Sequence, residues 1–234
     1  MPNSFADADT PRTRVEETLH AIRRDIIAGE FEPGAKLAVE SLRQRYGVGS
    51  STIREALSVL IPDGLVIARG QRGFNVSEIS IDDLKDLGRT RILLETHALR
   101  ESIALGDDDW EAGIVAAFHR LSKAQGALDQ GLPDSAADWE VRNHQFHDAL
   151  TAACESRWVH HILDMLHHHS ERYRRLALTD RSIPRDVHAE HRALMETTLA
   201  RDADAACEVA AQHIERTTDV LVIVSDRHTG LRSA

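Results

Sequence analysis

The sequence predicts a mainly α-helical protein of two parts. A small unit of three helices and a two-stranded β hairpin comes first, and an antiparallel bundle of about six helices follows. Composition supports a helical class, because aromatic residues make up only 4% of the 234 residues while Ala, Leu, Glu and Arg recur throughout. Apolar residues return at helical spacing along most of the chain. Only residues 65–76 carry short β patterns.

The first unit, residues 13–78, begins with a helix. Thr13 and Glu16 have the spacing of a capping box, in which the hydroxyl and the carboxylate bond early backbone N–H groups. Apolar residues at helical spacing continue this helix to about Ala28, and Gly29 can end it. Residues 1–12 carry acids and lack the apolar core of a signal peptide, so we expect them to form a short disordered arm.

Two further helices and two strands complete this unit. We expect the helices at residues 39–46 and 50–61, and the strands at residues 65–68 and 73–76. Three helices followed by a hairpin, all within about 65 residues, is the order of a winged helix-turn-helix domain. The sequence therefore predicts a unit that binds double-stranded DNA.

Residues 80–228 are predicted to be helical throughout, without a strand signal. Ser80 can cap the first of these helices, and Asp82 and Asp83 suit its first turn because the helix dipole favours acids there. We expect the six helices at residues 81–105, 109–129, 135–154, 157–177, 185–200 and 203–226.

Charge and cysteine usage narrow the class of protein. Residues 1–79 carry 10 Lys and Arg against 11 Asp and Glu, so they account for −1 of the net charge of −10 and the rest of the chain for −9. This asymmetry indicates two domains with different partners. No apolar run approaches the roughly 18 residues of a membrane span. Cys154 and Cys207 stand far apart, and we expect them to be reduced and buried in a cytoplasmic protein.

The predicted DNA contacts lie at the start of one helix and at the hairpin tip. A recognition helix enters the major groove with its N-terminal side chains near the base edges. Hydroxyls can bond phosphates or bases, and arginine can bond guanine or phosphate. Solvated surface residues are the alternative interpretation, but clustering on one face favours a DNA contact. The predicted set is Ser50, Ser51, Thr52, Arg54, Arg69, Gly70, Gln71 and Arg43.

The first unit also resembles a known family. Residues 17–78 are similar to the winged-helix domain of the GntR family of bacterial transcription regulators. Family members commonly carry Ser-Arg ahead of the recognition helix, where this chain has Gly49-Ser50, and this departure bears on the operator sequence. The residues that carry the likeness are Ile27-Ala28-Gly29, Pro33-Gly34, Leu37, Leu42, Tyr46-Gly47-Val48, Ile53-Arg54-Glu55-Ala56-Leu57, Asp63-Gly64-Leu65-Val66 and Arg72-Gly73-Phe74-Asn75-Val76.

The chain holds 14 histidines, which raises the question of a metal site. The consecutive histidines 167–169 cannot all face one ion, because neighbouring helix residues point about 100° apart. Asn143 and His147 are four residues apart and share a helix face. His191 and His213 lie on or near apolar faces of two later helices. A lone histidine there is more often a core residue than a ligand, so spacing alone leaves both interpretations open.

The second part resembles the ligand-binding domain of the FadR subfamily of GntR regulators, which is built from six antiparallel helices. In that subfamily an Asp, the His of a Phe-His pair and two later His hold a divalent metal, often zinc or nickel. The resemblance places this metal on Asn143, His147, His191 and His213. Asn143 replaces the Asp, and a neutral amide is a poorer ligand than a carboxylate. The likeness rests on Arg91-x-x-Leu94-Glu95, Phe146-His147-x-x-Leu150, Glu190-His191 and Ala210-x-x-His213.

A metal with open positions can accept a carboxylate, so the expected effector is a small organic acid. The resemblance makes Arg91 the arginine that points into the effector cavity, although an ion pair with Glu95 is also expected from their spacing. Arg172 and Tyr173, near another helix end, complete the predicted effector contacts, with Arg174 and Arg175 beside them.

A finer similarity is to the carbon-starvation-induced regulator group, which responds to glutarate and controls the use of glutarate and 2-hydroxyglutarate. It is carried by Tyr46-Gly47-Val48-Gly49, Gly106-x-x-x-Trp110-Glu111, Ala153-Cys154-x-Ser156-x-Trp158 and Glu171-Arg172-Tyr173-Arg174.

The sequence thus predicts a homodimeric repressor that reads a palindromic operator and is released by a small carboxylate. One alternative is a constitutive DNA-binding dimer whose helical part only dimerises. A metal-dependent hydrolase is the other, because three histidines also serve such enzymes. The chain has no H-E-x-x-H motif and the first unit has no evident enzymatic use, so we do not expect an enzyme.

Overall fold

The structure is a computed structural model that describes residues 13–70, 73–177, 183 and 185–229. The chain divides into two compact units, with the boundary between Ile79 and Ser80. The arm expected at residues 1–12 lies outside the described residues. No described helix is long and apolar enough to cross a membrane.

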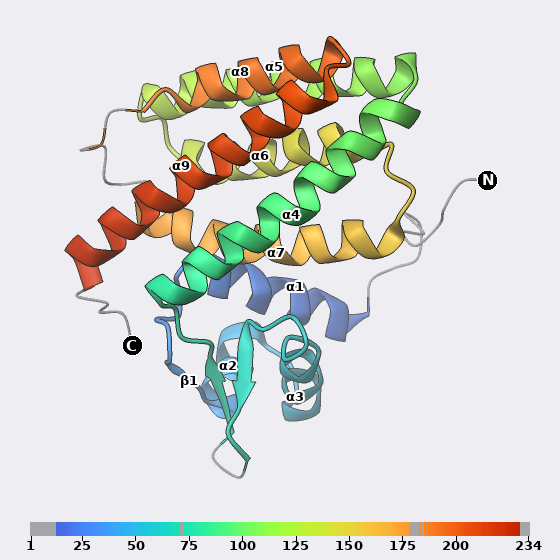
Figure 1. The fold of residues 1–234 in the computed structure, drawn as a ribbon. Helices are drawn as coiled ribbons and strands as arrows, with labels where there is room; N and C mark the ends of the chain where they lie inside the picture. Colours follow the sequence, from blue (N-terminus) through green and yellow to red (C-terminus); the bar gives the residue numbers. More distant parts are fainter. Residues whose placement is uncertain (1–12, 71–72, 178–182, 184, 230–234) are drawn as a thin grey trace. The chain divides into compact units, whose positions relative to one another are not determined.

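The first unit contains the three helices expected from the sequence (Figure 1). The capping box is present at the start of the first of them: the Thr13 hydroxyl accepts a hydrogen bond from the Glu16 backbone N–H at 3.2 Å, and the Glu16 carboxylate accepts one from the Thr13 N–H at 2.7 Å. In chain order the elements of the unit are α1 (Arg14–Ile27), β1 (Lys36–Leu37), α2 (Val39–Tyr46), α3 (Ser50–Val59), β2 (Val66–Ala68) and β3 (Phe74–Val76).

The strands form one antiparallel sheet in the order β1-β3-β2. The predicted wing is the β2–β3 pair, in which Val66 pairs with Val76. The third strand, β1, was not predicted, because two residues are too short to show an alternating pattern. Leu37 of β1 is buried, and the Asn75 side chain of β3 donates to the backbone carbonyl of Gly34, just before β1, at 2.9 Å.

A compact apolar core holds the first unit together. Ile22 from α1, Ile53 and Leu57 from α3, and Leu65 before β2 are all almost fully buried in one cluster. Burying an aliphatic side chain of this size contributes about 1.5–3 kcal/mol each. The core therefore packs against the inner face of α3 and does not cover the opposite face of this helix.

The second unit is a bundle of six helices within the described residues, the number predicted. Ser80 caps the first helix, since its hydroxyl accepts from the Asp83 N–H at 3.1 Å. α4 packs against α9, α5 against α6 and α8, and α8 against α9, as Figure 1 shows for α4 and α9. The helices are α4 (Ile81–Leu105), α5 (Asp108–Asp129), α6 (Ser135–Thr151), α7 (Arg157–Ala177), α8 (Val187–Leu199) and α9 (Ala203–Thr229).

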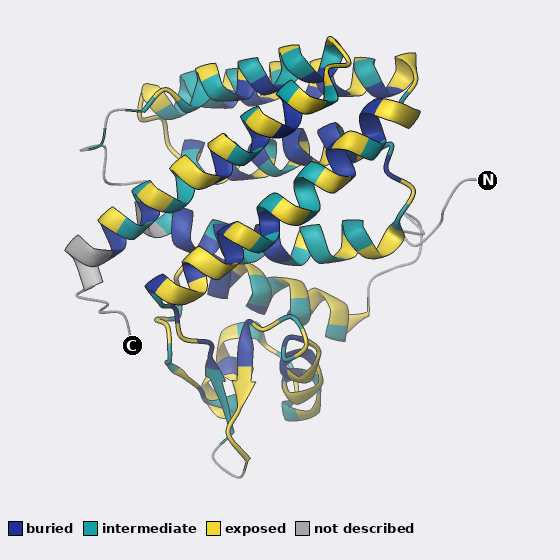
Figure 2. Cartoon of the chain, viewed as in Figure 1, coloured by how far each residue is buried: buried dark blue, intermediate teal, exposed yellow. Residues whose placement is uncertain are grey.

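The interior of the bundle combines an apolar cluster with buried polar side chains. Leu121, Phe146 and Leu194 belong to the apolar cluster. Figure 2 shows the buried residues of the chain in dark blue. Cys154 and Cys207 are buried and free, as predicted. The same interior also holds histidines, arginines and a glutamate that are more than 90% buried. Buried groups of this kind need partners, so they point to a site.

Candidate functional site

Three histidines from three helices meet inside the bundle. His147 on α6, His191 on α8 and His213 on α9 each offer one ring nitrogen, and the three nitrogens lie within 4.8 Å of one another. The side chains are 9%, 1% and 7% exposed, and their ring centroids are 4.7–5.5 Å apart. This is the arrangement in which imidazole nitrogens share one divalent ion. The structure thus brings together the three histidines of the predicted metal set.

His191 gives the clearest sign that a group is meant to bind here. Both of its ring nitrogens are buried, and neither has a hydrogen-bond partner among the described residues. Leaving such a nitrogen unsatisfied costs about 1–3 kcal/mol, and a bound metal ion would satisfy it. Burial lowers the pKa of His191 well below its usual value, and His213 and His147 lower it further. The ring is therefore neutral and has a free lone pair, as a metal ligand must.

His213 is held by an acidic neighbour. Its Nδ1 lies 2.8 Å from a carboxylate oxygen of Glu190 on α8, and Arg185 bonds both oxygens of that carboxylate. Burial lowers the pKa of His213 to about 4, although the hydrogen bond to Glu190 acts in the opposite direction. Burial raises the pKa of Glu190, but the bonds from His213 and Arg185 outweigh it and bring the value to about 2. The carboxylate is therefore charged and the imidazole neutral.

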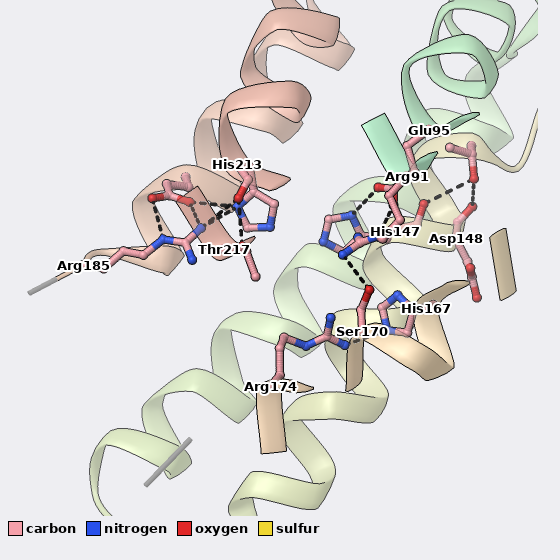
Figure 3. A network of polar contacts seen from close by, with 12 residues as sticks. Arg91, Glu95, His147, Asp148, His167, Ser170, Arg174, Arg185, His213 and Thr217 are labelled. Carbon is pink, nitrogen blue, oxygen red and sulfur yellow. Dashed lines mark hydrogen bonds and ion pairs between the residues drawn. The ribbon is translucent and has the colours of Figure 1, made fainter. Parts of the chain in front are cut away.

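His147 also lies near a glutamate that is paired with an arginine. Its Nδ1 lies 3.6 Å from a carboxylate oxygen of Glu95 on α4, and Arg91 Nε donates to the other oxygen at 2.7 Å (Figure 3). Burial raises the pKa of Glu95, but Arg91 and His147 outweigh it and hold the pKa well below its usual range. Arg91 also donates to the Ser170 hydroxyl at 3.2 Å. The ion pair expected between Arg91 and Glu95 is present, and it reaches the histidine cluster.

Asn143 completes the predicted metal set by position. It is 4% exposed and precedes His147 by one turn of α6, so both residues project from the same face. Its amide oxygen is neutral, whereas the subfamily resemblance expects a carboxylate at this point. A set of the three histidines and this asparagine would carry no formal negative charge, and such a set suits a borderline ion better than a hard one.

Two of the predicted effector residues, Arg172 and Tyr173, interact with the start of α4, whereas Arg91 lies further along that helix. Tyr173 donates its hydroxyl to the Asp83 carboxylate at 2.6 Å, at the start of α4. Asp83 precedes Arg91 by eight residues, or roughly 12 Å of helix. Burial lowers the pKa of Arg172, while Tyr173 and Asp83 raise it, so Arg172 lies in that same neighbourhood. The described hydrogen bonds of Tyr173 therefore lie at the start of α4.

Arg174 approaches the cluster. It makes a buried ion pair with Glu140 at 2.8 Å. Its guanidinium lies 3.2 Å from Nε2 of His167, and both residues are labelled in Figure 3. The ring of His167 is 6.2 Å from that of His147. Of the three consecutive histidines 167–169, only His167 is buried, which agrees with the divergent directions expected for neighbours on a helix.

Sequence reasoning missed the partners of these histidines. Glu190 is adjacent to His191, and neighbouring side chains on a helix diverge, so the sequence does not connect Glu190 with a second histidine. These two side chains do diverge, but Glu190 turns to His213 on another helix. No motif in the sequence marks Arg185 or Glu140 as a partner of a histidine or an arginine. Spacing within one helix carries no information about such contacts between helices, so only the tertiary structure reveals them.

The described residues of the predicted DNA-contact set are exposed or half-buried. Ser51 and Arg54 are exposed at the start of α3, and Ser50 and Thr52 are half-buried there. Arg43 on α2 is exposed and pairs with Glu40 at 2.7 Å.

The tip of the wing carries Arg69, which pairs with Glu78 at 3.2 Å, and Gly70, whose positive φ of 50° suits a glycine. Gln71 lies outside the described residues.

Known proteins match both units in the same order. The family described as bacterial regulatory proteins, gntR family, matches residues 14–76, and the FCD domain matches residues 86–216. A relative from Paraburkholderia xenovorans, the HTH-type transcriptional regulator BphR, is 42% identical over 93% of this chain and 91% of its own length. The chain belongs to the GntR family.

One further relative and two solved structures also match most of the chain. The HTH-type transcriptional repressor GlaR of Escherichia coli is 33% identical over 82% of this chain and 89% of the relative. Two solved structures share the fold at 19% and 17% identity: a GntR transcriptional regulator from Rhodococcus sp. RHA1, with a TM-score of 0.73, and McbR/YncC of E. coli, with a TM-score of 0.75. Each covers 90% of this chain, and the match spans 98% of the solved chain.

The family settles the class of function. This GntR-family chain is a DNA-binding transcription regulator with an FCD domain, and the prediction that it is not an enzyme is confirmed by its relatives. FCD domains can bind divalent metals, and this one has a possible three-histidine site.

Proposed function

We propose that the chain is a repressor whose helical domain binds a small carboxylic acid at a divalent metal, zinc or nickel. His147, His191 and His213 hold the ion, and Asn143 contributes its amide oxygen. The observation that carries the proposal is the buried cluster itself, in which His191 has two ring nitrogens without a partner among the described residues. The ion supplies open coordination positions to which an effector carboxylate can bind.

The effector we propose is a dicarboxylate such as glutarate or 2-hydroxyglutarate. One carboxylate binds the metal, and Arg91 is the proposed partner of the second, because it belongs to the polar network around His147. The resemblance to glutarate-responsive regulators and the 33% identity to a repressor support this choice. Contacts of the effector with Arg172 and Tyr173 remain predictions, since the described bonds of Tyr173 lie at the start of α4.

On DNA we propose a homodimer that reads a palindromic operator in the cytoplasm. Each α3 enters a major groove with Ser50, Ser51, Thr52 and Arg54 at its leading end. The wing, with Arg69, Gly70 and Gln71, and Arg43 on α2 contact the phosphate backbone. The effector favours a state of the dimer that no longer matches the half-sites, so affinity for the operator falls.

Operator binding in the presence of candidate acids tests this function. The metal-loaded protein is titrated onto its operator with and without glutarate, 2-hydroxyglutarate and a set of mono- and dicarboxylates. We expect one acid to raise the melting temperature and to weaken operator binding over the same concentration range. If no acid in a broad set does either, while operator binding persists, the protein is a constitutive DNA-binding dimer and the sensor proposal is wrong.

A further inference from the structure

Two series of interacting side chains reach the histidine cluster, one from α8, α9 and the residues before α8, and the other from α4 and α6. Each consists of an arginine, a glutamate and a histidine: Arg185, Glu190 and His213 in one, and Arg91, Glu95 and His147 in the other. Figure 3 shows Arg185 beside His213, and Arg91 and Glu95 beside His147. Both glutamates face Nδ1 of their histidine, but only Glu190, at 2.8 Å, is within hydrogen-bond distance, whereas Glu95 lies at 3.6 Å.

The contact with Glu190 determines where His213 carries its proton. A carboxylate oxygen and a ring nitrogen at 2.8 Å attract each other only if a proton lies between them, because two lone pairs would repel. Arg185 donates to both oxygens of the Glu190 carboxylate, so the carboxylate is the acceptor of the contact, the proton is on Nδ1 and Nε2 keeps its lone pair. Arg185 also lies 3.4 Å from Nδ1, but a guanidinium cannot accept that proton and its contact is longer.

Arg185 in turn fixes the orientation of Glu190. Its Nε donates to one carboxylate oxygen at 2.9 Å and its Nη2 to the other at 2.5 Å, which is the two-pronged geometry of an Arg–carboxylate pair. Nη2 also donates to the backbone carbonyl of His213 at 3.1 Å. Both side chains are more than 85% buried. The carboxylate is therefore held on both sides and has little freedom to leave the imidazole.

We propose that Glu190 is a positioning residue of the metal centre: it accepts the Nδ1–H of His213, directs Nε2 toward the ion, and is itself held by Arg185. This inference rests on the proposed metal site. Glu95 lies 3.6 Å from Nδ1 of His147, which is beyond hydrogen-bond distance, so the inference is confined to Glu190.

This arrangement bears on Asn143. A carboxylate that accepts a hydrogen bond from a coordinating histidine makes that histidine a more basic ligand. The ligand set of three histidines and a neutral amide gains donor strength in this way. Glu190 and His191, adjacent in sequence, therefore serve one ion by different routes: His191 binds it and Glu190 orients His213.

Zinc affinity of the full-length protein tests the inference. Wild type, Glu190→Gln and Glu208→Gln are titrated with zinc in competition with a chromophoric chelator. Glu208 is the matched control, an exposed glutamate on α9 that bonds only to its neighbour Gln212 among the contacts described. We expect Glu190→Gln to bind zinc about 10–100-fold more weakly, the usual effect of losing such a partner, and Glu208→Gln to match wild type. Equal affinity of Glu190→Gln and wild type would overturn the inference.

A second measurement does not depend on the variant folding. Nitrogen-15 NMR of the metal-free wild type reports which ring nitrogen of His213 is protonated. We expect Nδ1–H, and an Nε2–H form would overturn the inference. If wild type shows Nδ1–H but binds no zinc at all, the proposed metal function fails while the placement of the proton stands. If His191→Ala loses zinc but Glu190→Gln does not, the metal function stands and the role of Glu190 fails.

Discussion

Asn143 is the position at which this chain departs from the metal set that the resemblance to the FadR subfamily implies. It is buried one turn before His147, where a carboxylate would cancel part of the charge of a divalent ion. An amide oxygen leaves that charge in place, in an interior where charge is poorly solvated. We therefore expect the native site to hold metal less tightly than an aspartate version of the same site.

Replacing Asn143 by Asp should strengthen metal binding. We expect Asn143→Asp to lower the dissociation constant for zinc on the order of tenfold, which is about 1.4 kcal/mol. Gln145→Glu adds the same charge on the exposed face of α6 and should leave the affinity unchanged. Chelator competition measures both. Equal affinity of Asn143→Asp and wild type would show that Asn143 does not face the ion.

The buried pair of Arg174 and Glu140 makes a separate prediction for stability. Their side chains are 10% and 1% exposed, and three hydrogen bonds join them. Glu140→Gln leaves the guanidinium of Arg174 buried without its counter-charge, which costs about 3–5 kcal/mol. Urea unfolding of the metal-free protein measures this loss. A change below about 0.5 kcal/mol, the range of ordinary surface substitutions, would contradict it.

At the scale of elements, the sequence predicted the helices well and the sheet less completely. The periodic apolar residues of α2 and α7 gave their bounds, because burial of one face imposes that period. β1 was missed because its pairing with β3 is a long-range contact that two residues cannot signal. α6 ends at Thr151 rather than at Cys154, where Glu101 of α4 accepts from the Glu155 N–H and the Cys154 thiol instead.

The candidate site was also predicted only in part. The three histidines could be predicted because each belongs to a motif of residues that are close in sequence: Phe-His on α6, Glu-His on α8 and Ala-x-x-His on α9. The partners that orient them were not found. The bond from His213 to Glu190 joins residues 23 apart on different helices, and nothing in either helix alone marks it.

The exposed face of α3 carries the prediction about operator binding. Arg54 is exposed one turn into the helix, while Ile53 and Leu57 hold the inner face. We expect Arg54→Ala to weaken operator binding by about 1–3 kcal/mol if it contacts a base, with a shallower salt dependence if it contacts phosphate. Arg24→Ala, which removes an arginine that is 75% exposed on α1, is the control. Fluorescence anisotropy at several salt concentrations measures both, and equal binding by the two variants would exclude Arg54 from the interface.

At the scale of the whole molecule, the proposed switch couples the two units through a change in the dimer. An effector can shift that equilibrium only by the difference between its affinities for the two states. The metal matters here because it provides a strong, directional contact for a carboxylate inside the bundle. Removing the ion with a chelator should therefore abolish the response to the acid while leaving operator binding of the effector-free protein in place. Release of DNA by the acid in the metal-free protein would contradict this coupling.

The central claim is that the histidine cluster holds a divalent ion, and elemental analysis of the purified full-length protein tests it most directly. We expect wild type, after exposure to zinc and removal of the excess, to retain about one ion per chain, as a site with three histidine ligands does. His191→Ala, shown by circular dichroism to keep its helical content, should retain none. A wild-type protein that keeps no metal after zinc loading, or a His191→Ala variant that keeps as much as wild type, would contradict the account.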